Sequence, residues 1–361
     1  MPTTTECFGS TYDDARAKFR AGVRAAGAEL ETHVLEGHLG AQGEALSMDA
    51  TVLGPADATR LIVMTSGTHG PEGFCGSGSQ VALLHDTELH GRLAAEGIAL
   101  LLVHAVNPYG FSHLRRVNED NIDLNRNCVD FARPRPANPG YAELHDLLLP
   151  AEWPPTEANR QALADFIRER GEQAYQFAVT LGQYDHPDGM FYGGAERAWS
   201  LRTLQQILQT HGRGKRSVVW LDIHTGLGPR GHAEKIHTGA VAELPFARRC
   251  WGADVFSLSE TTSKSAPVSG PISLLLAQAC PGAEQASVAL EYGTVPVLPV
   301  LDAVRGDHWL NRRQGDASAE EVVAVKAAMR EAFYGDADDW RGMVLGQART
   351  AVLQALCGMR H

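Results

Sequence analysis

The sequence lacks the features that mark membrane proteins and secreted proteins. Its 361 residues contain no uninterrupted apolar run of about 18 residues, the length that a membrane-spanning helix requires. The N-terminus, Met1 to Glu6, has neither the basic start nor the apolar stretch of a secretory signal. We therefore expect no membrane partner and a soluble protein of the cytoplasm.

Basic residues and paired cysteines are also scarce. The chain has 32 Lys and Arg against 43 Asp and Glu, a formal net charge of -11, and no sustained basic run. Because such a chain repels a polyanion, we expect no nucleic-acid partner. The six cysteines are scattered without a close pair, which excludes a zinc ribbon and a dithiol redox motif.

The composition that remains is that of an ordinary globular protein. Apolar residues make up 44% of the chain and charged residues 21%, and the chain is long enough to bury a substantial core. Helical patterns alternate with apolar runs typical of buried strands. These runs are Leu61–Met64, Ile98–Ala105, Val218–Leu221 and the shorter Ser287–Leu290. The alternation predicts an α/β fold of three layers, α/β/α, with a mostly parallel mixed central sheet.

We expect a single domain over residues 1–361. Residues 1–55 would supply a helix and edge strands, 56–315 the core that carries the site, and 316–361 the C-terminal helices. The proline-rich stretch Phe131–Pro155 is predicted to run extended over the surface. Other expected elements are a helix after Ser10-Thr11, a hairpin of His33–His38 with Ala45–Leu53, and helices over Asn159–Ala178, Ala317–Phe333 and Met343–Leu356.

Polar clusters follow the apolar runs at the points where the predicted strands end. In an open α/β sheet, ligands bind at the carboxyl ends of the strands. The clusters are Thr68–Glu72, Asn107–Gly110, Asp222–Gly226 and Glu291–Gly293. We therefore expect the functional residues to come from these segments.

His69, Glu72 and His224 are the candidate metal ligands. His69 and Glu72 stand three apart in a glycine-flanked turn, a pair that arises often by chance. A third ligand from another strand end would leave the fourth position of a tetrahedron for water, as in catalytic zinc sites. His224 is the best candidate for that ligand, with a satisfied core histidine as the alternative. These residues predict one Zn²⁺ per chain.

Glu291 and an arginine-rich stretch supply the other candidate groups. A carboxylate at the end of a buried strand is costly unless it is paired, solvated or used, so Glu291 is either a general base or a salt-bridged structural residue. The stretch Arg115–Asn127 offers guanidinium forks that can grip a carboxylate or stabilise an oxyanion. Its alternative is a solvated surface loop.

With these residues in place, the sequence resembles the zinc carboxypeptidase family and its relatives, the succinylglutamate desuccinylases and aspartoacylases. The order and approximate spacing of the motifs agree from Leu61 to Val295. Two glycine- and tyrosine-rich stretches resemble a bacterial branch of that family and would form a lid, a pocket wall or an ordinary loop. The matching motifs are His69–Glu72, Asn107–Gly110, Asp123–Asn127, Asp222–His224 and Leu290–Tyr292, and the glycine- and tyrosine-rich stretches are Gly182–Tyr184 and Gly189–Gly194.

The resemblance implies a role for each matching residue. It implies that His69, Glu72 and His224 bind zinc and that Glu291 is the general base. It also implies that Arg116 polarises the scissile carbonyl, a role that Arg115 could take instead, and that Asn125 and Arg126 clamp a substrate carboxylate. Tyr192 is a further candidate for substrate binding.

One departure from the family leaves the substrate open. Digestive carboxypeptidases place a mobile tyrosine between the third metal ligand and the catalytic glutamate, and this chain has no tyrosine between His224 and Glu291. Either Tyr184 or Tyr192 replaces it, or the substrate is not a peptide C-terminus. Side-chain preference would be set between Cys250 and Ser287, where the candidates by position are Asp254, Ser257, Ser259 and Thr262.

The predicted function is therefore a zinc-dependent hydrolase that cleaves an amide bond next to a carboxylate-bearing residue. A metallocarboxypeptidase is favoured, because the roughly 70 residues after Glu291 are short for a second β domain over the cleft. The alternatives are an N-acyl-amino-acid deacylase and, more remotely, a non-catalytic zinc-binding protein on this fold. A small peptide or an acyl-amino acid would be the partner, and the sequence indicates no oligomeric state.

Overall fold

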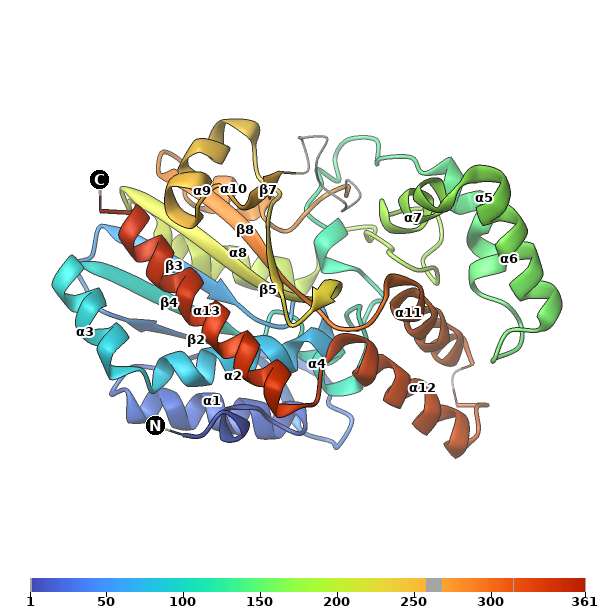
Figure 1. Ribbon diagram of the computed structural model, residues 1–361, viewed down its shortest axis with the longest axis horizontal. Coiled ribbons are helices and arrows are strands. Elements are labelled where there is room, and N and C mark those ends of the chain that lie inside the picture. Colours follow the sequence, from blue (N-terminus) through green and yellow to red (C-terminus); the bar gives the residue numbers. More distant parts are fainter. Residues whose placement is uncertain (1, 258–267, 314, 361) are drawn as a thin grey trace.

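The computed structural model describes residues 2–257, 268–313 and 315–360, which form one eight-stranded sheet with helices on both faces (Figure 1). The strands are β1 Glu31–Leu39, β2 Ala45–Leu53, β3 Arg60–Thr65, β4 Ile98–His104, β5 Ser217–Arg230, β6 Ala233–His237, β7 Val255–Ser257 and β8 Glu284–Gly293. The longer helices are α1 Tyr12–Ala25, α2 Gly73–Leu84, α3 Thr87–Glu96, α5 Pro139–Leu148, α6 Glu157–Arg170, α7 Glu172–Thr180, α8 Trp199–Gly212, α9 Leu244–Trp251, α11 Val297–Arg312, α12 Ala319–Phe333 and α13 Asp338–Gly358. Two short helices are α4 Pro108–His113 and α10 Leu274–Ala279. No helix within the described ranges has the length and apolar character needed to cross a bilayer.

The sheet is mixed, and its centre is parallel. The strand order is β1-β2-β4-β3-β5-β8-β6-β7. The four central strands β4, β3, β5 and β8 run parallel, whereas β1 with β2, β2 with β4, and β6 with β8 are antiparallel. From β3 the chain passes outward to β4 on one side and later to β5 on the other. This reversal of direction opens a crevice at the carboxyl ends of β3 and β5, where ligands bind in open α/β sheets.

Helices cover the sheet on both faces, as the sequence predicts. Strand β3 alternates: Ile62 and Met64 pack with α1, α2, α9 and α13, while Leu61 and Val63 pack with α8 and α10. In Figure 1, α13 crosses in front of the sheet and α8 lies behind it. The three-layer α/β/α architecture is therefore confirmed.

Five helices form a group beside the sheet, which we call the helical lobe. It comprises α5, α6 and α7 from the middle of the chain and α11 and α12 from its end, which lie together on the right in Figure 1. They share one apolar cluster, to which α5 contributes Tyr141 and Leu144, α7 Val179, α11 Val304, and α12 Met329. Segments far apart in sequence are thus joined by burial of apolar surface.

Most elements agree with the sequence prediction, and a few in the middle of the chain differ from it. The N-terminal helix and the hairpin of β1 and β2 are confirmed. Phe131–Pro155 is not simply extended, because α5 begins at Pro139, a residue favoured in the first turn of a helix. The expected helix over Asn159–Ala178 is two helices, broken at Gly171, whose φ of 89° interrupts the helical path. Strand β6 was missed because its sequence, AEKIH, has no apolar run.

A buried ion-pair network fastens the helical lobe to the loop after α4. Asp307 of α11 accepts from Arg115 Nε at 2.9 Å and from Lys326 Nζ of α12 at 2.7 Å. Burial alone would raise the pKa of the Asp307 carboxyl, but the two cations lower it to about 2. The carboxylate is therefore ionised in the folded chain well below the pH at which a free aspartate is protonated.

We predict that Asp307→Asn lowers the free energy of unfolding by about 3 kcal/mol at pH 7, because Arg115 is left buried without its partner. The folded pKa lies below the ordinary 3.8, so this contribution is complete above about pH 4 and is lost as the pH falls toward 2. Urea unfolding of both proteins at several pH values should show their difference shrinking over that interval. Asp165→Asn, in an exposed pair with Arg168, is the control and should leave the midpoint unchanged.

Candidate metal centre and active site

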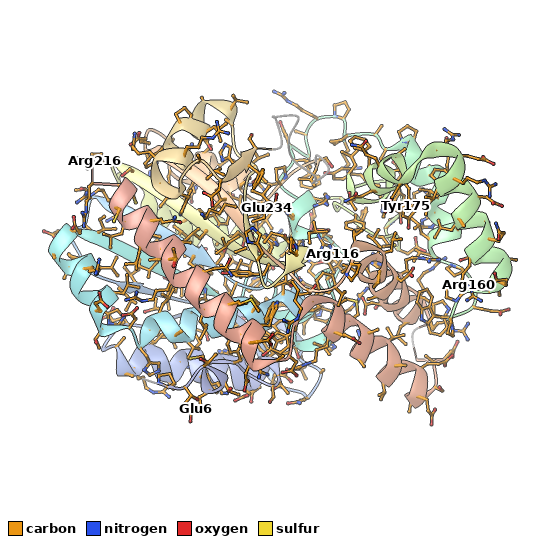
Figure 2. All side chains as sticks on the ribbon, in the orientation of Figure 1. Glu6, Arg116, Arg160, Tyr175, Arg216 and Glu234 are labelled. Carbon is orange, nitrogen blue, oxygen red and sulfur yellow. The ribbon has the colours of Figure 1, made fainter. Side chains whose placement is uncertain are left out.

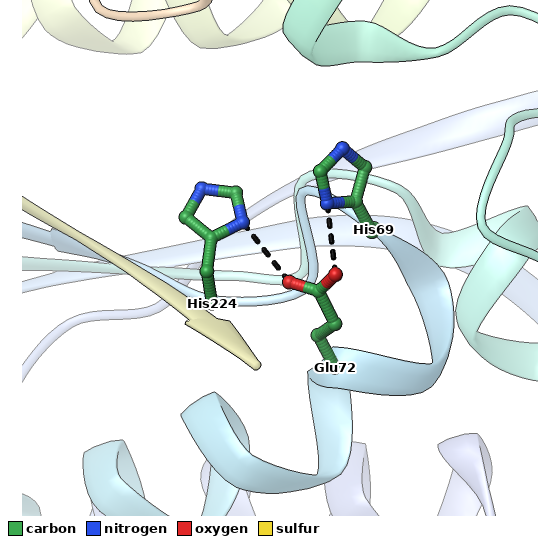
Figure 3. A group of neighbouring side chains, drawn as sticks. All are labelled: His69, Glu72 and His224. Atoms are coloured by element: carbon green, nitrogen blue, oxygen red, sulfur yellow. Dashed lines mark hydrogen bonds and ion pairs between the residues drawn. The ribbon is translucent and has the colours of Figure 1, made fainter. Parts of the chain in front are cut away.

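Two histidines and one glutamate form the centre of the candidate site. His69 precedes and Glu72 ends a 3-10 turn, Gly70–Glu72, after β3, and His224 lies in β5. His69 Nδ1 and His224 Nδ1 each lie 2.9 Å from a different oxygen of Glu72 (Figure 3). The three side chains are buried, and their ligand atoms lie within 4.8 Å of one another. The structure thus brings together the three residues that the sequence singles out as ligands.

A second carboxylate holds the remote nitrogen of each imidazole. His224 Nε2 lies 2.7 Å from Asp222 Oδ2, and His69 Nε2 lies 3.1 Å from Asp123 Oδ1. Asp222 is itself held by the hydroxyl of Thr68, which donates to Oδ1 at 2.9 Å. Carboxylates in this position fix the tautomer and orientation of metal-binding imidazoles. With a cation bound, each ring would carry its proton on Nε2 and leave the Nδ1 lone pair for that cation; without one, an Nδ1–H can donate to Glu72.

The donor set and the local charge both fit a zinc ion. Two imidazole nitrogens and one carboxylate oxygen are typical zinc ligands, and three protein ligands leave a position open. When ionised, Glu72, Glu291 and the two outer carboxylates carry four negative charges, against two positive charges on Arg116 and Arg126. A divalent cation would balance the difference. Although burial opposes it, the two imidazoles hold the pKa of Glu72 below its usual range.

Glu291 stands beside the third candidate ligand. It pairs with His224 in the register of β5 and β8, and its Oε1 accepts a hydrogen bond of 3.0 Å from Leu227 N. Burial, followed by repulsion from Glu72, raises the pKa of the Glu291 carboxyl. A carboxylate whose protonated form is within reach near neutral pH can take up a proton and give it back.

Arg116 lies at the edge of the same group, between the sheet and the helical lobe (Figure 2). Its Nε donates to Asp123 Oδ2 at 3.0 Å, and its Nη2 lies 2.9 Å from His69 Nε2. That nitrogen cannot accept from Arg116 and donate to Asp123 at once. A cation on His69 Nδ1 requires the proton on Nε2, which then donates to Asp123. In that state Arg116 Nη2 is available to a substrate oxygen.

Asn125 and Arg126 lie in the 3-10 turn Leu124–Arg126. They line a cavity that the three candidate metal ligands also line. Arg126 donates from Nε and Nη2 to the carbonyl of Thr180, at 3.0 and 2.6 Å. The side-chain oxygen of Asn125 accepts from Ile272 N at 3.0 Å. Burial lowers the pKa of Arg126 to about 10, so the guanidinium is still charged at neutral pH. Its remaining N–H groups can receive a carboxylate.

Arg115 and Tyr192, expected as substrate contacts, do not line this cavity. Arg115 is turned away and pairs with Asp307, whereas Arg116 lines the cavity. Tyr192 is buried in the apolar cluster shared with α8 and α10, and its neighbour Phe191 faces the cavity instead. The Phe191 ring lies 5.0 Å from the guanidinium carbon of Arg116.

Neither tyrosine replaces the mobile tyrosine of digestive carboxypeptidases. Tyr184 donates from its hydroxyl to the carbonyl of Arg126 at 2.6 Å, a fixed structural contact. Among the residues that the structure describes, no tyrosine lines the cavity. The glycine- and tyrosine-rich stretch Gly189–Gly194 contributes a pocket wall through Phe191.

The remaining cavity walls could not be found from sequence motifs. The helical lobe contributes Gln176 of α7 and three residues of α11, Val297, Val300 and Leu301. Thr238, the residue that follows β6, also lines the cavity. These residues have ordinary apolar or polar side chains in helical or loop patterns, and only the packing of the lobe against β5 brings them to the site.

Of the residues proposed by position for side-chain preference, the two that the structure describes are not in the cavity wall. Asp254 accepts from Lys235 Nζ at 2.7 Å at the outer edge of the sheet, and Ser257 also lies away from the cavity. Ser259 and Thr262 lie outside the described residues. Val268, which follows that segment, does line the cavity.

Comparisons with known proteins assign the chain to a family. A family model described as "Protein of unknown function (DUF2817)" matches residues 8–347, so the chain belongs to this family. A search of curated proteins finds no match.

Solved structures of metallocarboxypeptidases and of a desuccinylase are similar to the chain, and these are the groups that its motifs resemble. One is a metallo-carboxypeptidase from Burkholderia cenocepacia, at 12% identity and a TM-score of 0.42, covering 90% of this chain and 68% of that chain. Another is a metallo-carboxypeptidase from Pseudomonas aeruginosa in complex with (2-guanidinoethylmercapto)succinic acid. Its identity is 16% and its TM-score 0.38, and the match covers 92% of this chain and 69% of that chain. A third is a succinylglutamate desuccinylase from Silicibacter sp. TM1040. Its identity is 13% and its TM-score 0.37, and the match covers 84% of this chain and 65% of that chain. At these identities the likeness carries no activity over to this chain.

We predict about one zinc per chain in protein purified without chelator, measured by elemental analysis. His69→Ala and His224→Ala should each lose the metal, because two remaining ligands hold zinc weakly. His113→Ala is the control and should keep the metal, because the ring contacts the Leu39 carbonyl and the Tyr109 ring and does not line the cavity. Zinc retained in both ligand variants would place the metal elsewhere.

The outer carboxylates give a separate prediction. Asp222→Asn should weaken zinc binding by about 10- to 100-fold in a chelator competition, because the amide holds the His224 ring less firmly and lowers its basicity. Asp254→Asn, at the sheet edge, should leave the affinity unchanged. Equal affinity in Asp222→Asn and the wild type would show that this carboxylate does not support the metal.

Proposed function

We propose that this member of the DUF2817 family is a zinc-dependent hydrolase that cleaves an amide bond next to a carboxylate-bearing residue, as a metallocarboxypeptidase does. The observation that carries the proposal is the placement of Glu291. It is a buried carboxylate with a raised pKa, one strand away from His224 and facing the same cavity as His69 and Glu72. A site that only binds a metal has no need of such a group.

Zinc, when held by His69, Glu72 and His224, supplies a Lewis acid that polarises a carbonyl oxygen and lowers the pKa of water. Glu291 accepts a proton from the attacking water on one carboxylate oxygen. The backbone N–H of Leu227 donates to the other oxygen, Oε1, and holds the side chain in place. The water oxygen then bonds to the carbonyl carbon.

Collapse of the tetrahedral adduct breaks the carbon–nitrogen bond. Glu291 returns its proton to the departing nitrogen, so the products are a carboxylic acid and an amine, and no oxidant or co-substrate is needed. Arg116 stabilises the negative charge that develops on the carbonyl oxygen, from a side chain that is held by Asp123 but still reaches the cavity.

Arg126 and Asn125 orient the substrate by its carboxylate. The Arg126 guanidinium is fixed by two bonds to the Thr180 carbonyl, so little side-chain entropy is lost when a carboxylate binds. This contact would place the scissile amide at a defined distance from Glu291. The proposed substrates are therefore small peptides or acyl-amino acids.

Deacylation of N-acyl-amino acids is a second candidate, favoured by the helical lobe. Gln176 of α7 and the α11 residues Val300 and Leu301 wall the cavity from the helical lobe. A wall at that place limits how much chain a substrate can carry beyond its scissile bond. Short acyl groups satisfy this constraint more easily than a long polypeptide.

We predict that Glu291→Gln lowers kcat/KM on the order of a thousandfold while zinc content stays at the wild-type level, because the amide cannot accept the proton. Hydrolysis of blocked peptides and acyl-amino acids, followed by amine release, measures the change. Glu284→Gln, at the exposed start of the same strand, is the matched control and should keep wild-type activity. Wild-type turnover by Glu291→Gln would refute the assignment.

A further inference from the structure

One side of the cavity is an apolar wall built mainly by helices α11 and α12. The wall consists of Leu227 from β5, Val297, Val300 and Leu301 from α11, and Phe333 from α12. It begins directly after the third metal ligand, because Leu227 is three residues from His224 and its N–H holds Glu291. The wall therefore adjoins the place where the amide bond would be cleaved.

The wall is held rigidly against the sheet. The hydroxyl of Thr225 donates to the carbonyl of Phe333 at 2.6 Å, and the hydroxyl of Thr294 donates to that of Ala332 at 2.6 Å. A Cβ atom on Gly226 would lie 3.1 Å from the Phe333 ring and 3.7 Å from Val300 Cγ1. Strand β5 and the two helices thus meet without space between them beside the metal ligands.

Among the described lining residues of the cavity, charge is confined to one group of side chains around the candidate metal ligands. Among the described residues that line it, the charged and titratable ones are the three metal ligands, Glu291, Arg116 and Arg126. None of them belongs to the wall. A charged substituent lying against the wall would lose its hydration, and the described wall residues offer it no charged partner.

We infer that the cavity accepts an apolar acyl group, so that the preferred substrate is an amide with an apolar acyl part and a carboxylate on the amine part. The inference rests on the proposed function. A substrate whose carboxylate reaches Arg126 and Asn125, and whose carbonyl lies at the metal ligands, extends its acyl part along the wall. This excludes succinyl groups, whose far carboxylate would be buried against Val300 and Leu301.

Two sources could supply such an acyl part, a straight alkanoyl chain or an apolar residue of a short blocked peptide. The test uses zinc-loaded protein and N-acyl derivatives of alanine and of phenylalanine, with acetyl, butanoyl, hexanoyl and succinyl groups. N-acetyl-leucyl-alanine and N-acetyl-leucyl-phenylalanine form the peptide arm. Whichever arm gives the higher kcat/KM identifies the source.

We expect kcat/KM to rise with chain length from acetyl to hexanoyl by up to about fourfold per methylene, the equivalent of about 0.8 kcal/mol. Succinyl and butanoyl have the same number of carbons, so they form a matched pair, and the succinyl compound should be at least tenfold poorer. A kcat/KM that is independent of chain length, or a preference for succinyl, would overturn the inference.

Two neighbouring residues of α11 give matched variants. Val297 lines the cavity and is partly buried, whereas Leu298 is 43% exposed and does not line it. Val297→Gln should reduce the preference for hexanoyl over acetyl by at least fivefold, and Leu298→Gln should leave it unchanged. Should Val297→Gln fold poorly, Val300→Thr adds a hydroxyl to the wall with little change of volume and should lower the same preference.

A binding measurement separates this inference from the proposed function. Calorimetry with zinc-loaded Glu291→Gln protein should show tighter binding of N-hexanoyl-alanine than of N-acetyl-alanine or N-succinyl-alanine. If this order holds but the wild type hydrolyses nothing, the apolar site stands and the hydrolase proposal fails. If the wild type hydrolyses the panel without this order in binding, the hydrolase stands and the apolar site fails.

Discussion

The burial of the Glu72 carboxylate is the constraint on which the site depends. A desolvated carboxylate is costly, and here it is compensated by the two imidazoles that hold its oxygens at 2.9 Å. Each imidazole is in turn held by a further buried carboxylate, Asp123 or Asp222. The result is a rigid group at the carboxyl ends of β3 and β5. Its excess of negative charge suits a divalent cation.

The same constraint accounts for the neighbouring arginines. Asp123 carries part of the negative charge, and Arg116 and then Arg126 hold its pKa well below the usual range in spite of burial. Arg116 therefore stays close to the candidate metal ligands, and the centre of the Phe191 ring lies 5.0 Å from the guanidinium carbon of Arg116 and 5.4 Å from that of Arg126. Groups that stabilise the fold in this way are already positioned to act on a substrate.

The helical lobe turns a sheet-edge site into a walled cavity. Its α7 end holds Arg126 through the Thr180 carbonyl, and its α12 end is held to β5 through Thr225. The buried pair of Arg115 and Asp307 fastens the same lobe to the loop that carries Arg116. In the proposed enzyme, a few side chains outside the candidate metal site would therefore link substrate choice to fold stability.

The sequence by itself determined the sheet core and the candidate reacting groups. Apolar runs such as Ile98–Ala105 form strands because both faces are buried, and short motifs at strand ends mark His69, Glu72, His224 and Glu291, since parallel strands bring their carboxyl ends together. Only the tertiary structure decided which of two adjacent residues faces the cavity, Arg116 rather than Arg115 and Phe191 rather than Tyr192. It also decided the cavity walls, because an apolar helix residue has the same local pattern whether it packs in a core or faces a substrate, and only long-range packing separates the two.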